Sequence, residues 1–87
     1  MSIKDLETCF YEASIQGYKY VGVKIEMEEF PKAEIIINEN ANFEKKFEYY
    51  KKAYNNDLTL KTFNGIKIIG FTYGDTFEEI EKDLLGA

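Results

Sequence analysis

The sequence predicts an α+β fold in which two β-hairpins form a four-stranded antiparallel sheet, with three helices in the order α-ββ-α-ββ-α. Two observations lead to this fold class. Apolar and polar residues alternate on either side of two turn segments, and a stretch with helical periodicity separates the two hairpins. Hairpins favour an antiparallel sheet, and helices must then cover it. We expect the 87 residues to form one small domain, residues 1–87.

The first helix is expected over residues 2–15. Ser2 and Asp5 have the spacing of a capping box, with Asp in place of the usual Glu or Gln. Gly17 follows as the residue that ends the helix. The first hairpin comes next, with strands at residues 18–27 and 33–38.

The central helix is expected over residues 42–54, between the two hairpins. Its large aromatic residues are spaced by four, three and four positions, which places them on one helical face. They are Phe43, Phe47, Tyr50 and Tyr54.

The second hairpin is expected to join strands at residues 58–63 and 66–73 through Asn64-Gly65. This dipeptide favours a type I′ turn, because both central positions need positive φ. The last helix then starts after Thr76, and Glu79 completes a second capping box.

The fourth strand is apolar on both predicted faces. Ile66 and Ile68 fall on one face, and Ile69, Phe71 and Tyr73 fall on the other. Either helices cover both faces of the sheet, or one face is an exposed aromatic patch that binds something.

Composition argues against several kinds of chemistry. The net charge is −5, and all eleven basic residues are Lys, so the chain has no Arg to read phosphate or guanine and would repel a nucleic-acid backbone. It has no His, the commonest general base, and Cys9 is its one cysteine. We therefore expect no enzyme activity, no catalytic residues, no cofactor, no metal and no direct binding of nucleic acid.

Apolar segments are short throughout, and the longest unbroken run is Ile35-Ile36-Ile37. A membrane-spanning helix needs roughly 20 residues. The N-terminus also lacks the pattern of a signal peptide. We expect a protein that does not enter a membrane and that stays in the cytoplasm of a bacterial cell.

A cluster of acidic residues surrounds the predicted turn of the first hairpin. Glu26, Glu28 and Glu29, together with Tyr20 on the preceding strand, are the residues we expect to bind a partner protein. The alternative is a solvated charge cluster that protects a strand edge.

Two resemblances come from short motifs. Residues 70–79, with their Gly-Asp-Thr-x-Glu-Glu run, resemble the strand-to-helix segment of HicB-type antitoxins over about a tenth of the chain. More broadly, residues 18–23, 28–31 and 66–75 resemble small uncharacterised proteins of phages and prophages of low-GC Gram-positive bacteria. That class includes inhibitors of host defence, among them anti-CRISPR proteins, which act by binding.

Three functional hypotheses follow. The first is a non-enzymatic, acidic protein-binding protein that inhibits a host defence or nucleic-acid-binding protein. The second is a structural or self-associating accessory module, such as a virion-associated protein, that forms a homo-oligomer through a sheet face or edge. The third is a small-molecule or nucleotide-binding protein that uses Lys19, Lys24 and Lys67.

Overall fold

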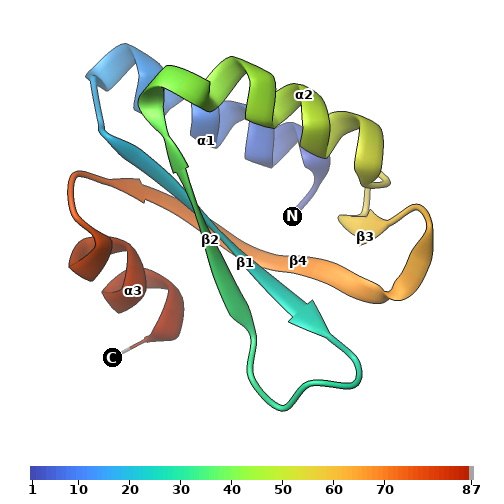
Figure 1. The fold of residues 1–87 in the computed structure, drawn as a ribbon. Helices are drawn as coiled ribbons and strands as arrows, with labels where there is room; N and C mark the ends of the chain where they lie inside the picture. Colours follow the sequence, from blue (N-terminus) through green and yellow to red (C-terminus); the bar gives the residue numbers. More distant parts are fainter. Residues whose placement is uncertain (87) are drawn as a thin grey trace.

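The computed structural model describes residues 1–86 and confirms the predicted fold class. Within these residues, three α-helices accompany one four-stranded antiparallel sheet with strand order β2-β1-β4-β3 (Figure 1). A short 3-10 turn, η1, leads into the second helix. The elements are α1 (Ile3–Gln16), β1 (Tyr20–Met27), β2 (Glu34–Glu39), η1 (Asn40–Asn42), α2 (Phe43–Ala53), β3 (Thr59–Leu60), β4 (Phe63–Gly74) and α3 (Phe77–Leu85).

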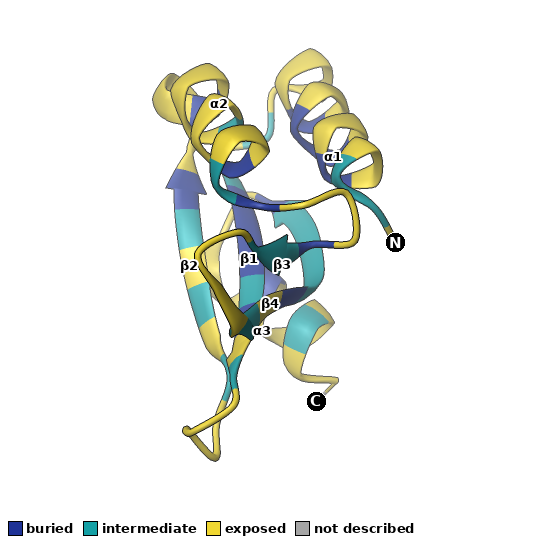
Figure 2. Cartoon of the chain, turned by 90° about the vertical axis from the view of Figure 1, so that its right-hand side faces the viewer, coloured by how far each residue is buried: buried dark blue, intermediate teal, exposed yellow. Residues whose placement is uncertain are grey.

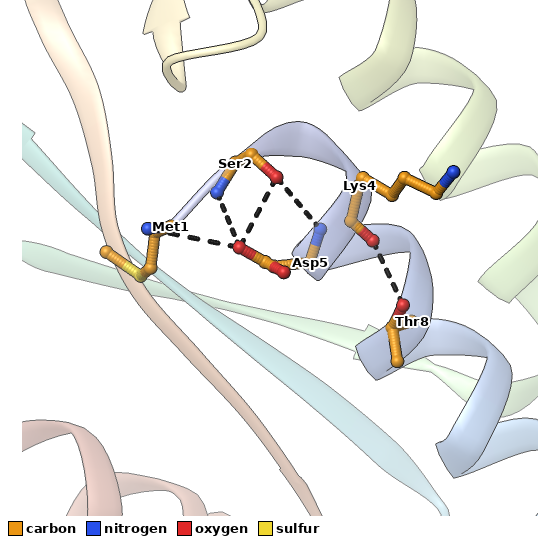
Figure 3. A network of polar contacts seen from close by, with 5 residues as sticks. All are labelled: Met1, Ser2, Lys4, Asp5 and Thr8. Carbon is orange, nitrogen blue, oxygen red and sulfur yellow. Dashed lines mark hydrogen bonds and ion pairs between the residues drawn. The ribbon is translucent and has the colours of Figure 1, made fainter.

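Helix α1 begins with the predicted capping box (Figure 3). The Asp5 N–H donates to Ser2 Oγ at 3.3 Å, and the Ser2 N–H donates to Asp5 Oδ2 at 2.8 Å. The N-terminal ammonium of Met1 lies 3.9 Å from the same carboxylate oxygen. Gly17 ends the helix with φ of 74°, a left-handed conformation that glycine adopts without steric cost.

The three helices cover the sheet unequally. Helices α1 and α2 lie side by side over one face, and α3 lies alone on the other (Figure 1). The ring of Phe10 in α1 contacts three aromatic rings of α2, those of Phe43, Phe47 and Tyr50. Phe10 and Phe43 pack edge to face, with ring centroids 5.4 Å apart. The main core therefore lies between the helix pair and the inner side chains of β1, which are Val21, Val23 and Ile25.

Strand β4 differs from the prediction that both of its faces are apolar. A β-bulge opposite Lys24 and Ile25 leaves Ile69 without a partner in β1. The extra residue shifts the alternation, so that side chains on either side of it fall on the same face. Ile66, Ile68, Phe71 and Tyr73 consequently all pack against the core beneath α1 and α2.

The second hairpin turns earlier than predicted. Leu60 pairs directly with Phe63, so the turn is Lys61-Thr62, and β3 is only two residues long. Gly65 is held instead in the ladder with β1, where its carbonyl accepts from the Glu28 N–H at 2.8 Å. Pairing with β1 thus overrides the local preference of Asn64-Gly65 for a turn.

Helix α3 packs closely on β1 because of a glycine. A side chain at Gly22 would overlap Ile80, which is fully buried. One half of the predicted capping box is present, with the Glu79 N–H donating to Thr76 Oγ1 at 3.1 Å. The Glu79 carboxylate accepts from the Thr76 hydroxyl rather than from its backbone N–H. At the start of the helix, the rings of Tyr20 and Phe77 are in tilted contact, with centroids 4.9 Å apart.

One polar side chain, Asn38 of β2, lies inside the core with 1% exposure. Its amide nitrogen donates to the Val21 carbonyl at 3.0 Å, and its oxygen accepts from the Tyr50 hydroxyl at 3.4 Å. A buried amide is tolerated when its donors and acceptors are paired, as they are here. These bonds join β2 to both β1 and α2.

Candidate functional site

The structure brings together three of the four predicted binding residues. Glu26 lies at the end of β1, and Glu28 and Glu29 lie in the turn that follows; all three are exposed. This turn extends beyond the helices (Figure 2). Tyr20 lies at the opposite end of β1, about 20 Å away for six residues of extended strand.

The structure gives Tyr20 a packing contact rather than a place beside the acidic turn. Its half-buried ring rests on Phe77 and holds the first turn of α3 against the sheet. Tyr20 therefore does not belong to the same surface as the glutamates.

Two phenylalanines that were not predicted from the sequence as binding residues lie beside the glutamates. Phe30 is 61% exposed and Phe63 is 51% exposed. They border a small apolar hollow of about 70 Å³, together with Met27 and Ile66. We call the set Glu26, Glu28, Glu29, Phe30 and Phe63 the hairpin tip.

One signal in the sequence could have identified part of this surface. Phe30 stands in a short polar turn beside Pro31, where no strand or helix periodicity directs its ring to the core. Phe63 carried no such signal, because its exposure follows from the unexpected turn at residues 61–62.

The carboxylates of the hairpin tip are available to a partner. Lys67 lies opposite Glu26 in the β1–β4 ladder. Even so, none of the three glutamates forms an ion pair with another side chain of residues 1–86. Their negative charge is therefore offset only by solvent and by nearby exposed lysines.

A second apolar hollow, of about 230 Å³, lies between α1 and α2 and is bordered by Glu7, Glu44 and Glu48. Two of its phenylalanines, Phe10 and Phe43, are buried members of the core, and the third, Phe47, packs partly buried against it. Phe30 and Phe63, by contrast, expose rings that carry no polar atom, which is the less favourable arrangement in water. The hairpin tip is thus the stronger candidate for a binding surface.

The lysines suggested for a small-molecule site do not converge. Lys24 donates from Nζ to the Leu84 carbonyl at 2.8 Å and so satisfies the end of α3. Lys19 precedes β1 and Lys67 pairs near its far end, so they lie at opposite ends of the sheet.

Cys9 lies in the buried face of α1. Burial, and to a lesser extent the charge of Glu12, raise the pKa of its thiol to about 12. The thiol is therefore protonated at neutral pH and lacks the thiolate that a nucleophile or metal ligand requires.

Within the described part of the chain, no three His, Cys, Asp or Glu side chains are grouped so as to hold a metal ion. Nor does any helix in residues 1–86 have the length and apolar character required to cross a membrane.

No family model matches the chain, and neither a curated protein nor a solved structure was found to match it.

Proposed function

We propose that this chain is a non-enzymatic protein-binding protein that engages a basic surface of its partner through the hairpin tip. The observation that carries this proposal is the pair of exposed phenylalanines around an apolar hollow, with three unpaired glutamates beside them. Aromatic residues supply much of the energy at protein interfaces. Surrounding charges guide association and select the partner.

A basic partner fits the charge of this surface and of the whole chain, which is −5. Host nucleic-acid-binding proteins, including those of phage defence, are basic where they contact phosphate. The resemblance to small phage proteins supports the same class of partner, and inhibition would follow if the hairpin tip covers that basic surface. The absence of His and the protonated thiol support a function without catalysis.

The test begins with the tagged chain in lysate of its bacterial host, with captured proteins identified by mass spectrometry. Association of the purified partner is then measured with Phe30→Ser/Phe63→Ser and with Glu26→Lys/Glu28→Lys/Glu29→Lys. The first variant should raise the dissociation rate at least tenfold. The second should slow association and flatten its salt dependence.

A matched control changes the net charge by the same amount elsewhere. Glu7→Lys/Glu48→Lys/Glu81→Lys reverses three exposed glutamates on the helices. If this control slows association as much as the hairpin-tip variant, net charge alone drives binding and the proposed surface is wrong.

Self-association is a second candidate function, and the uncovered outer edge of β2 favours it. This strand is the last in the sheet order and carries the run Ile35-Ile36-Ile37. Sedimentation across a wide concentration range distinguishes the two functions, because a chain that stays monomeric does not assemble through β2.

A further inference from the structure

Half of β4 has a strand on one side only. Residues 70–74 pair with β1, whereas β3 reaches only Phe63 and Lys67 at the other end of the strand. Figure 1 shows β3 beside one end of β4 only. Within residues 1–86, the stretch from Gly70 to Gly74 is therefore a free sheet edge.

The direction of its backbone groups follows from the ladder. In an antiparallel pair, hydrogen bonds join alternate pairs of opposite residues. The Asn40 N–H donates to the Lys19 carbonyl at 2.9 Å, which turns the odd-numbered residues of β1 toward β2. The even-numbered residues then face β4 and bond their partners Gly70, Thr72 and Gly74.

The intervening residues Phe71 and Tyr73 consequently turn their N–H and C=O groups away from β1. No backbone or side-chain group of residues 1–86 forms a hydrogen bond with these N–H groups. A row of unpaired donors and acceptors is the template to which another extended chain pairs.

Helices flank this edge on both faces and form a groove of about 540 Å³. On one face, the Tyr73 hydroxyl donates to Glu12 of α1 at 3.4 Å. On the other, Thr72 Oγ1 donates to Asp83 of α3 at 3.0 Å. Glu79 of α3 and the capping residue Asp5 also line the groove, so carboxylates stand on both sides of the edge.

These charges select the occupant. A second copy of this chain paired edge to edge would bring Glu12, Glu79 and Asp83 close to their own counterparts, and like charges at such distances repel. An extended segment with Lys or Arg at alternate positions would instead direct its cations toward the carboxylates on one face of the sheet, because strand side chains alternate between faces. Its backbone would pair with Phe71 and Tyr73.

We infer that the free edge of β4 binds an extended, Lys- or Arg-rich segment of a partner protein as an added strand. This inference rests on the proposed function, because the occupant is a protein, but it concerns a surface separate from the hairpin tip. It defines the conformation and the charge of the segment that the groove accepts.

The test uses a synthetic nine-residue peptide of alternating lysine and valine, capped at both ends, and follows amide hydrogen exchange by NMR. Binding should protect the amides of Phe71 and Tyr73 at least tenfold, with little change at Gly70 and Thr72, which β1 already protects. A peptide with proline in place of valine keeps the charge but cannot sustain the ladder, and it should give no protection. A glutamate–valine peptide should not bind.

Variants link the protection to the groove. Glu12→Lys/Asp83→Lys should weaken peptide binding at least tenfold, whereas Glu44→Lys/Glu48→Lys, with the same change in net charge, should bind within about threefold of the original. The inference is overturned if the peptide does not bind, if the proline peptide protects equally, or if protection falls on Ile35 and Ile37 of β2.

A final variant keeps this test separate from the proposed function. Phe30→Ser/Phe63→Ser changes only the hairpin tip and should leave the protection of Phe71 and Tyr73 by the peptide intact. If this variant loses the natural partner but still binds the peptide, the hairpin tip and the groove act independently. If it also loses protection of the β4 amides, the groove is not a separate site and the inference is overturned.

Discussion

Within residues 1–86, the sheet has two free edges, and they differ in their surroundings. The edge at β2 is six residues long, carries three consecutive isoleucines, and has glutamates only at its two ends. The edge at β4 is five residues long, lies between two helices, and has carboxylates on both faces. Both present unpaired backbone groups, but only the second surrounds them with charge.

The comparison shows that two strand edges with similar free backbone groups can favour different binding partners, because the side chains around them differ. Charges beside an exposed edge commonly prevent pairing with a second copy. At β4 the same charges also attract a cationic strand, whereas at β2 the apolar run offers no such selection. We therefore infer that the β4 edge accepts a cationic strand in addition to any contact made by the hairpin tip, and we attribute any self-association to β2.

Removal of one side of the β4 groove should have the largest effect. Ile80→Ala empties a fully buried position beneath α3, and large-to-small core changes of this kind cost about 2–5 kcal/mol. Urea unfolding measures the loss. Because α3 contacts β1 and β4, the variant should weaken peptide binding at β4 yet leave any association through β2 unchanged. Equal loss at both edges would show that they are not independent.

Cys9, which lines the same groove, reports whether α1 stays in place. Its thiol pKa of about 12, against an ordinary value of 9.0, lowers the thiolate fraction at pH 8 about a thousandfold. Iodoacetamide should therefore label the native protein about a thousandfold more slowly than the urea-unfolded chain. The native rate should rise about tenfold for each pH unit between 8 and 11. Rapid labelling at pH 8 would mean that α1 opens away from β4.

The anchoring of β2 should show a smaller effect. Asn38→Ala leaves the Tyr50 hydroxyl buried without its partner, at a cost of about 1–3 kcal/mol. Tyr50→Phe leaves the buried side-chain oxygen of Asn38 without the hydroxyl that donates to it, and should also cost about 1–3 kcal/mol. Denaturant unfolding of both variants and of the double variant measures the coupling. Additive losses would show that the bond contributes nothing to holding β2.

Local sequence signals were sufficient to predict features that depend only on residues close together in the sequence. Ser2 with Asp5 and Thr76 with Glu79 marked two helix starts, because a cap needs only residues three positions apart. The acidic residues of the turn were likewise visible as a cluster.

Features that depend on pairing between distant segments were not predictable from the sequence. The bulge at Ile69 follows from the register with β1, and the same ladder holds Gly65 out of a turn. The burial of the polar residue Asn38 was not predictable, because its hydrogen-bond partners, Val21 and Tyr50, come from other elements. The edge of β4 is free because β3 is only two residues long, and no local sequence pattern indicated that length.

The most direct test of the account is amide hydrogen exchange of the protein alone. We predict that Phe71 and Tyr73 exchange at least about a hundredfold faster than Gly70 and Thr72, since only the latter pair bonds to β1. Alternation of fast and slow amides along β4 would establish a free edge that is ready to accept a strand. Equal protection at all four amides would contradict the account, because the edge would then already be occupied.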